Sequence, residues 1–295
     1  MNPEAIIAVI IPTYDRPGLL QKCLRSLSIQ TLPKTLWEVI VVNDGGVDVS
    51  EMVQTFGDNF NSSSQKNQGP AAARNYGATL TKVPIFAFLD DDCQASPTWL
   101  EEIAKNSKPG VLMGGTVVNY YRDNLFSESS QLLIAFLYQH FQDTPNQFFT
   151  SNNFSIHRTD FMQHGGFQNQ FITSAGEDRE FCVRLNHQGM ELKFIPEVEI
   201  IHFHQMTLVS FIRLHRKYGK AALIFQKIMK SQKIAIQKRP RLEFYRKLVV
   251  FPFYQNHLSK KEKFFVSLSL MLSQICVAQG YLLGKIHSQK PFKVG

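Results

Sequence analysis

Three short apolar runs, each rich in β-branched or aromatic residues and each ending in polar side chains, most constrain how this chain folds. They are IIAVII at 6–11, WEVIVVNDGG at 37–46 and VPIFAFLDDD at 83–92. An apolar run of this length is typical of a strand covered on both faces. Between the runs, leucines recur at helical spacing over 19–27, and PAAARNYGATL at 70–80 has helix-forming composition. The alternation predicts an α/β fold with a mostly parallel central sheet flanked by helices.

Polar residues follow each of these predicted strands. They are Thr13, Tyr14 and Asp15, then Asn43, Asp44 and Gly45, then Asp90, Asp91 and Asp92. Ligands of such sheets bind beyond the carboxyl ends of the strands, so these side chains are expected to share one crevice. The first strand is followed by PTYDRP and not by a GxGxxG loop, which disfavours a dinucleotide-dependent enzyme. Clustered carboxylates that face a nucleotide phosphate instead predict a divalent hard cation between them. Without a bound cation, at least one of these carboxyl groups should have a raised pKa.

Length and cysteine usage limit the class of protein further. The chain has 295 residues, 44% of them hydrophobic, which is enough for a substantial core in one or two domains. The four cysteines lie far apart with no paired spacing, which argues against a disulfide framework and a structural zinc site and favours a reducing compartment. The N-terminal segment has no basic residue before its apolar run, so no signal peptide is expected.

Charge divides the chain unevenly. Residues 1–204 hold 14 Lys+Arg against 22 Asp+Glu, a net of −8, whereas residues 205–295 hold 18 against 2, a net of +16. A basic region of this kind can bind an anionic membrane surface or nucleic acid, or it can be a solvated helical face. Nucleic acid is the least favoured partner because no reading module is recognisable there.

The C-terminal region combines this charge with apolar runs. FIRLHRKYGKAALIFQKIMKSQK places basic residues among apolar ones at helical spacing, and FFVSLSLMLSQICVAQGYLLG at 264–284 is 21 uncharged residues. The second segment is long enough to span a bilayer, but its serines and glutamines equally allow a helix that lies in the interface or packs on the protein. We expect a catalytic domain over 1–210 and a basic, helical, membrane-associated region over 211–295.

Six motifs in order resemble the family 2 inverting glycosyltransferases, which have the A-type fold. They are VIIPTYDRPGLLQKCLRSL, EVIVVNDGG, NQGPAAARNYG, FAFLDDD, GEDREFCVRL at 176–185 and HFH at 202–204. The resemblance covers about residues 5–220. It implies transfer of a sugar from a nucleotide diphosphate donor, usually a UDP-sugar, with inversion at the anomeric carbon and Mn²⁺ or Mg²⁺ as cofactor.

The resemblance also implies roles for individual residues. Nucleotide-sugar binding falls to Pro12, Tyr14, Asp15, Asp44, Arg74, Asp90, Asp91 and Asn153. Asp92 becomes the metal ligand, with His202 or His204 as a second one; the two histidines alternate along a predicted strand and so point the same way. Asp178 becomes the base that deprotonates the acceptor hydroxyl, with Glu177 beside it, and the reverse assignment stays open.

The acidic residues, Arg74 and the two histidines also have structural alternatives. An aspartate after a strand often caps a helix or closes a turn, and an arginine can form a surface salt bridge. Glu177 and Asp178 can be the acidic start of a helix, and a histidine at a strand end is often only hydrogen-bonded.

The function expected from the sequence is a metal-dependent inverting glycosyltransferase acting on a glycan or glycolipid hydroxyl, on the cytoplasmic face of the plasma membrane as a peripheral or monotopic protein. A synthase that charges a polyprenyl phosphate with a sugar is the alternative among enzymes. A non-catalytic nucleotide-binding or membrane-surface protein is the alternative of another class. The donor sugar, the acceptor, the linkage and the oligomeric state stay open.

Overall fold

The computed structural model describes residues 4–171, 175–236 and 242–288. The chain forms two compact units: Met1–Tyr120 with Pro145–Phe203, and Tyr121–Thr144 with His204–Gly295. This division differs from the predicted boundary at 210/211, because a segment from the middle of the sequence packs with the C-terminal helices. Its helix α5 (Leu125–Phe141) buries Leu132, Leu133 and Phe136 against Phe244, Leu248 and Leu270.

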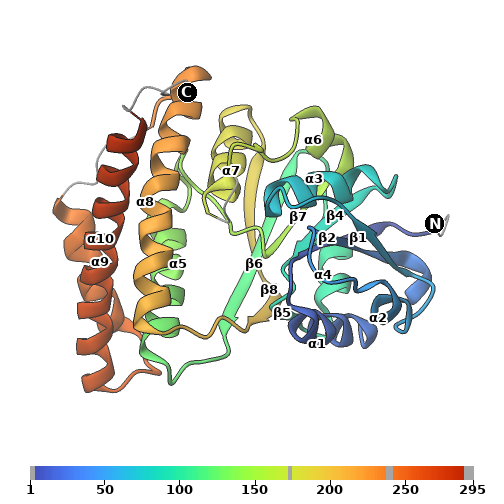
Figure 1. Cartoon of the computed structure of the whole chain (residues 1–295), viewed down its shortest axis with the longest axis horizontal. Coiled ribbons are helices and arrows are strands. Elements are labelled where there is room, and N and C mark those ends of the chain that lie inside the picture. The colour runs from blue at the N-terminus through green and yellow to red at the C-terminus, as the bar shows by residue number, and fades with distance from the viewer. Residues whose placement is uncertain (1–3, 172–174, 237–241, 289–295) are drawn as a thin grey trace, which may run out of the picture. The chain divides into compact units, whose positions relative to one another are not determined.

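The first unit contains one eight-stranded sheet in the order β3-β2-β1-β4-β7-β6-β8-β5 (Figure 1). Its first half is parallel and consists of β1 (Ile7–Thr13), β2 (Trp37–Asn43), β3 (Phe60–Ser64) and β4 (Ile85–Leu89). Every residue of β1, β2 and β4 is buried, which explains why these strands are continuous apolar runs. These are the three strands that the sequence predicts.

The second half of the sheet is mixed. Strand β7 (Asn153–His157) is antiparallel to both β4 and β6 (Val111–Asn119), while β8 (Glu191–His202) is parallel to β6. The short β5 (Cys93–Ala95) is antiparallel to β8. The α/β class is therefore confirmed, with a sheet that is parallel on one side and mixed on the other.

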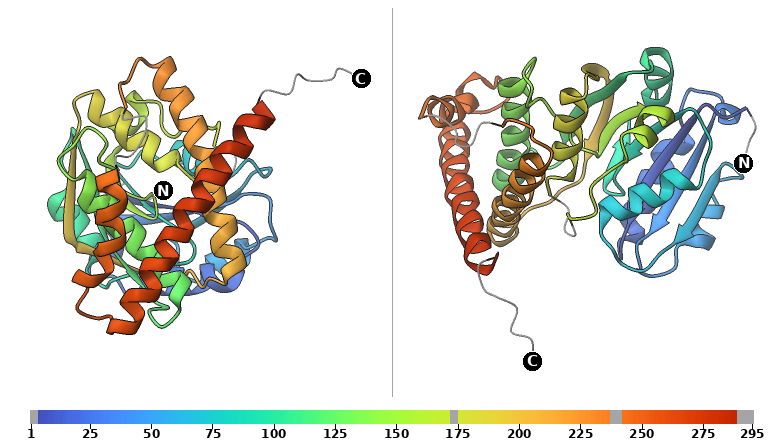
Figure 2. Two further views of the ribbon diagram at one scale, coloured as in Figure 1. Left: turned by 90° about the vertical axis from the view of Figure 1, so that its left-hand side faces the viewer. Right: turned by 90° about the horizontal axis from the view of Figure 1, so that it is seen from above.

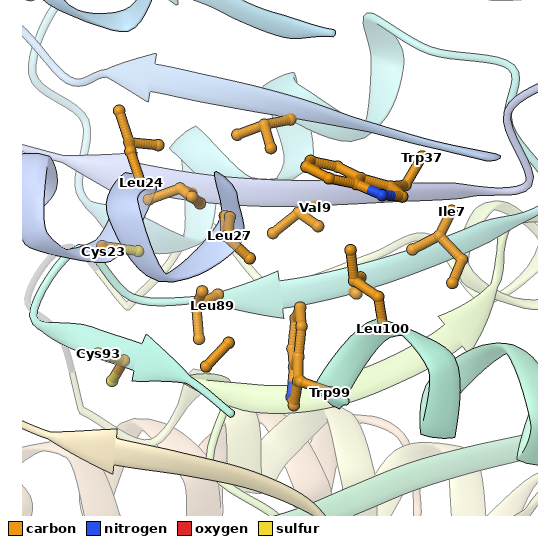
Figure 3. Packing of buried hydrophobic residues seen from close by; sticks show 14 of the residues in the cluster. Ile7, Val9, Cys23, Leu24, Leu27, Trp37, Leu89, Cys93, Trp99 and Leu100 are labelled. Carbon is orange, nitrogen blue, oxygen red and sulfur yellow. The ribbon is translucent and has the colours of Figure 1, made fainter. Parts of the chain in front are cut away.

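Helices cover both faces of this sheet (Figure 1). One face carries α1 (Pro17–Ser28), the short α2 (Ser50–Gln54) and α4 (Trp99–Asn106), whose apolar residues join the strands in one buried cluster. Figure 3 shows Leu24 and Leu27 of α1 and Trp99 of α4 in the same buried cluster as Val9 and Trp37 of the strands. The other face carries α3 (Pro70–Thr79), α6 (Arg158–Gln163) and α7 (Glu177–His187). A single turn of 3₁₀ helix, Lys34–Leu36, precedes β2.

Close packing of α3 on the sheet depends on one glycine. A Cβ at Gly77 would lie 2.7 Å from Ile10 Cγ2 on β1, so only glycine lets α3 approach this closely. The same approach brings the buried residues of α3, including Arg74, next to the carboxyl end of the sheet.

The second unit is helical, as the sequence predicts for its C-terminal part. Besides α5 it contains α8 (Leu208–Ser231), α9 (Leu242–Val250), the 3₁₀ turn η2 (Phe251–Tyr254) and α10 (Lys260–Ser288). Helices α8 and α10 lie side by side (Figures 1 and 2). They touch through backbone: a Cβ at Gly219 would lie 2.1 Å from the Val277 carbonyl oxygen, and one at Gly280 would lie 2.0 Å from that of Arg216.

Among the described residues, α10 is the one helix whose length and apolar composition would allow it to cross a membrane. The candidate span is Lys260–Ile286. An 18-residue window within it has a mean hydropathy of 1.5, and 39% of that window is buried inside the protein. Core helices of soluble proteins meet the same criterion, so the composition of α10 does not by itself assign it to a membrane.

Candidate functional site

The aspartate run begins where β4 ends, at the carboxyl edge of the parallel half of the sheet. Asp91 is fully buried: Thr13 Oγ1 donates to its Oδ2 at 2.7 Å, and Arg16 Nη2 lies 2.5 Å from its Oδ1. Burial raises the pKa of Asp91 to about 7, which the nearby Arg16 opposes and the neighbouring Asp92 reinforces. A raised carboxyl pKa in this run agrees with the prediction, but its main cause is burial and not the closeness of the carboxylates. Asp91 thereby ties the end of β1 to the end of β4.

Arg16 is a site residue that the sequence reasoning missed. It follows β1 in PTYDRP, and its Nη1 lies 2.8 Å from Asp92 Oδ2 while its Nη2 pairs with Asp91. Burial works against the charge of Arg16, but the attraction of Asp92 and Asp91 outweighs it and raises its pKa. The one available signal was the position of Arg16. It follows β1, and the acidic residues that follow the neighbouring parallel strand β4 lie at the same edge of the sheet.

Asp92 and His202 come together because β5 pairs with β8, which places Cys93 opposite His202. The His202 Nε2 lies 3.4 Å from Asp92 Oδ1. Burial would lower the pKa of His202, but the charge of Asp92 and the bond between them raise it. Asp92, Cys93 and His202 offer ligand atoms that all lie within 4.8 Å of one another.

These residues fit a divalent hard cation. Asp92 supplies the carboxylate that Mg²⁺ and Mn²⁺ prefer, and His202 supplies the imidazole nitrogen most used as a metal ligand in proteins. Cys93 offers a soft sulfur ligand, which Mg²⁺ and Mn²⁺ do not favour. Two protein ligands leave coordination positions for phosphate oxygens and water, as is usual for magnesium.

His204 lies just beyond the end of β8, and its assignment as a metal ligand stays a prediction. The strand ends at His202, so the alternation that would point both histidines the same way does not extend to His204. His204 is the first residue of the second unit, which is described separately from the aspartate run. His202 is the histidine that the pairing of β5 with β8 brings to Asp92.

Arg74 connects the aspartate run to the second acidic motif. It is buried on α3, its Nη2 pairs with Asp90 Oδ1, and its Nη1 lies 3.3 Å from Glu177 Oε1. Its guanidinium also lies over the Phe167 ring, 5.7 Å from the centroid. The surface salt bridge considered as an alternative for Arg74 is therefore wrong: this is a buried cation between two carboxylates.

Glu177 and Asp178 begin α7, after Gly176, whose φ of 89° favours glycine. Glu177 is 4% exposed, and burial together with the charge of Asp178 raises its pKa to about 7, although Arg74 opposes the shift. Asp178 is half-buried and accepts a 2.7 Å hydrogen bond from the Arg179 N–H; burial raises its pKa as well. The segment just before, 172–174, lies outside the described residues.

Asp44 and Asp15 act within the protein as turn and cap residues. Asp44 is buried and accepts from Gln65 Nε2 at 2.7 Å, from Gln68 N at 2.9 Å and from Gly69 N at 2.8 Å, which fixes the entry to α3. Asp15 has a left-handed backbone with φ of 52° and accepts from Val47 N at 2.9 Å. A carboxylate has about four acceptor positions, so neither residue is closed to a further donor.

The remaining predicted residues differ in accessibility. Tyr14 is exposed directly after β1, while Pro12 is buried inside that strand opposite Val42. Asn153 is 1% exposed: it accepts from Trp99 Nε1 at 2.9 Å and donates to the carbonyls of Thr116 and Val198 at 2.9 and 2.8 Å. The Asn153 side chain therefore links β7 to β6, β8 and α4. Because these bonds occupy its amide, we do not include Asn153 among the residues proposed to bind the donor.

A cavity of about 790 Å³ lies in the second unit and not among these residues. Phe136 and His140 of α5, Arg246 and Lys247 of α9 and Phe251 of η2 are among the residues that line it. None of the predicted site residues does. The charged site residues lie instead at the carboxyl edge of the sheet in the first unit.

Comparison with known proteins gives the family. Residues 8–165 match the model of glycosyl transferase family 2, and residues 130–207 match that of the N-terminal domain of galactosyltransferase. The chain is 30% identical over 201 residues to glycosyltransferase AglE of Haloferax volcanii, covering 65% of each. It is 28% identical over 222 residues to validoxylamine A glucosyltransferase of Streptomyces hygroscopicus subsp. limoneus, covering 63% of this chain and 49% of that protein. The matches thus span about half to two thirds of the length of these relatives.

Solved structures agree in fold. The mannosyltransferase PcManGT from Pyrobaculum calidifontis, in complex with GDP-Man and Mn²⁺, is similar with a TM-score of 0.59 at 15% identity, over 97% of this chain and 81% of that one. Residues 1–349 of S. aureus TarS in complex with UDP are similar with a TM-score of 0.52 at 14% identity, over 97% and 92%. Since more than half of the sequence matches the family model and the fold agrees, the chain belongs to glycosyl transferase family 2.

Proposed function

We propose that this chain is a metal-dependent inverting glycosyltransferase that moves a sugar from a nucleotide diphosphate donor, a UDP-sugar, to a hydroxyl of a glycan or glycolipid. The observation that carries the proposal is the position of Arg74. It joins the strand-end Asp90 to Glu177 at the start of α7, so one buried cation connects the two acidic motifs. Solved structures of the same fold hold GDP-Man with Mn²⁺ in one case and UDP in another.

Donor binding is assigned to the sheet edge. Asp92 and His202 would hold Mn²⁺ or Mg²⁺, and Asp90 would contact the ribose, with Tyr14, Asp15 and Asp44 at the nucleoside end. When bound, the ion supplies positive charge that stabilises the departing nucleoside diphosphate. Arg74 holds Asp90 in place on the protein side.

Deprotonation of the acceptor is assigned to Asp178. In the proposed reaction the hydroxyl proton passes to the Asp178 carboxylate while the hydroxyl oxygen attacks the anomeric carbon. The bond from that carbon to the diphosphate oxygen breaks, and its electron pair leaves with the nucleotide. Asp178 suits this role better than Glu177, because Glu177 is buried and already paired with Arg74, whereas Asp178 is half-buried. Its raised pKa makes it a stronger base than an ordinary aspartate.

The same carboxylates favour a hydroxyl acceptor over a polyprenyl phosphate. A phosphate acceptor needs little help from a base, and its charge would meet Glu177 and Asp178 with repulsion. A neutral hydroxyl meets no such cost.

We place the enzyme on the cytoplasmic face of a membrane. All four cysteines are free and buried, which is in keeping with a reducing compartment. The excess positive charge of residues 205–295 is in keeping with an anionic membrane surface.

The test is thermal unfolding with a panel of nucleotide sugars, with and without Mn²⁺. A donor that binds only the folded state raises its melting temperature. We expect one or a few UDP-sugars to do so only with Mn²⁺, and Asp92→Ala to abolish the rise. A wild-type chain that responds to no nucleotide sugar, or responds equally with a chelator present, would contradict the proposal.

A further inference from the structure

Helix α10 exposes a nearly continuous apolar face. Between residues 264 and 286, the exposed apolar residues are Phe264, Phe265, Leu268, Met271, Ile275, Ala278, Leu282, Leu283 and Ile286. Only Gln279 and Lys285 are exposed polar residues in the same stretch. Positions 264, 268, 271, 275, 278 and 282 alternate by four and three, so they lie on one side of the helix. The opposite side of α10 is buried within the second unit, including Leu270 and Cys276.

Positive charge borders this face. Helix α8 contains six basic residues and no acidic one, and two of them lie beside α10. Arg216 donates from Nε and Nη2 to Gln279 Oε1 at 3.1 and 2.9 Å, and the stem of Lys220 lies 3.7 Å from where a Cβ of Gly284 would be. After Glu262, the helix contains no acidic residue.

Aromatic residues gather at the N-terminal end of α10. Lys263 Nζ donates to the Phe253 carbonyl at 3.2 Å, which brings η2 beside the start of the helix. Phe253, Tyr254, Phe264 and Phe265 are all exposed there, together with Lys260 and Lys261. Aromatic rings and lysines in one place are typical of protein surfaces at the level of lipid headgroups.

We propose that this face, defined by the exposed apolar residues of α10 and the basic residues beside them, docks on the surface of an anionic lipid bilayer with α10 parallel to the membrane plane. The apolar row would enter the boundary between headgroups and acyl chains. Arg216, Lys220 and the lysines at the start of α10 would contact lipid phosphates. This goes beyond glycosyl transfer and rests on no step of it.

Two features favour lying on the membrane over crossing it. Because α8 runs against α10 through Gly219 and Gly280, a spanning α10 would draw Arg216 and Lys220 into the hydrocarbon. Charged side chains at that depth are strongly unfavourable. In addition, the buried side of α10 packs against α5, α8 and α9 and is not available to lipid.

Charge also favours a lipid surface over a second copy of this chain. A seam between paired helices is commonly bordered by charges of both signs, and here the border is basic. Two copies would bring like charges together, whereas an anionic leaflet is complementary to them.

The experiment is flotation of the full chain with vesicles of phosphatidylcholine alone and with about a third phosphatidylglycerol, at low salt. We expect binding to the anionic vesicles only, with a partition coefficient that falls about tenfold or more in Met271→Glu/Ile275→Glu. The matched control is Ile29→Glu, which changes an exposed isoleucine of the first unit and should bind as the wild type. Arg216→Gln/Lys220→Gln should weaken binding and reduce its salt dependence.

Several outcomes would overturn the proposal. The first is equal flotation of the double-glutamate variant and the wild type. The second is resistance of the bound protein to extraction by alkaline carbonate, because such resistance would indicate that α10 spans the membrane. A third is a wild-type dimer that the double-glutamate variant converts to a monomer, measured by sedimentation velocity, with vesicle binding unchanged. Melting temperature checks that each variant is folded. Mn²⁺-dependent nucleotide binding, measured in the same variants, is expected to be unchanged, and its absence in the wild type would contradict the catalytic proposal but not this one.

Discussion

Arg74 and Glu177 are 103 residues apart in the sequence, and their side chains meet at 3.3 Å inside the first unit. This contact, with the pairing of Arg74 to Asp90, makes one site from two motifs.

Replacing Arg74 by methionine should destabilise the protein. The substitution leaves the buried Glu177 and the partly buried Asp90 without their shared cation, and loss of one partner of a buried pair costs about 3 kcal/mol or more. Urea unfolding at pH 7 measures the free energy of unfolding of each variant. Lys105→Met is the control, because it removes an exposed lysine from its 3.5 Å pair with the partly buried Glu102 and should cost less than about 1 kcal/mol. Equal effects of the two substitutions would mean that Arg74 does not stabilise the site.

The stability of the protein should fall as pH rises through 7 because of Glu177. Its folded-state pKa of about 7 lies above its ordinary value of 4.5, so the folded chain holds this proton more tightly than the unfolded chain. The stabilisation that protonated Glu177 gives to the folded state is therefore fully present below about pH 4.5 and is lost as pH rises through about 7.

Urea unfolding between pH 5 and 8, with a chelator present, measures this slope. Glu177→Gln should reduce this slope and leave the part that comes from Asp91, whose pKa is also raised to about 7. Glu191→Gln, at an exposed position, should not change the slope. An unchanged slope in Glu177→Gln would place the titrating group elsewhere.

Asp178→Asn should stop sugar transfer and leave donor binding intact. The amide is close in size to the carboxylate but cannot take the acceptor proton, so turnover should fall by about 100-fold or more, the range for loss of a general base. Mn²⁺-dependent thermal stabilisation by the donor should persist. Turnover at the wild-type rate would show that another group is the base, and Glu177→Gln would then be the next variant to assay.

Asn153→Leu should reduce stability and leave nucleotide affinity unchanged. The Asn153 amide satisfies the Trp99 N–H and two backbone carbonyls, and each buried group left without a partner costs about 1–3 kcal/mol. Unfolding by urea and nucleotide titration of the same sample separate the two effects. A variant of normal stability with weakened donor binding would restore the role that the sequence resemblance assigns to Asn153.

The elements that the sequence predicts are those with a strong local pattern. Helix α1 has its apolar residues at helical spacing, and Leu20, Cys23, Leu24 and Leu27 are the ones buried. Strand β6 escaped prediction because it contains Gly114 and Gly115, which usually mark breaks. Both are needed in the structure, since a Cβ would collide with the Phe149 ring at the first and with the Val198 carbonyl at the second.

The site was predictable where its residues lie at strand ends and unpredictable where they meet across the fold. The sequence indicates Asp90, Asp91, Asp92, Glu177 and Asp178 as acidic motifs, and it suggests Arg74 by resemblance. Apart from the position of Arg16 after the first strand, it does not indicate that Arg16 bridges Asp91 and Asp92, which lie 75 and 76 residues further along the chain. Nor does a resemblance distinguish Asn153, which is occupied by internal hydrogen bonds, from a residue that is free to contact a sugar.

Gly219 of α8 and Gly280 of α10 determine how closely these two helices pack in the second unit. Since backbone meets backbone at Gly219 and Gly280, the distance between the basic row of α8 and the apolar row of α10 is set by main-chain contact. Side chains on either helix can then change in size or polarity without altering that distance. The width of the docking face is therefore a fixed dimension of the fold, and its affinity for lipid can be tuned by composition alone.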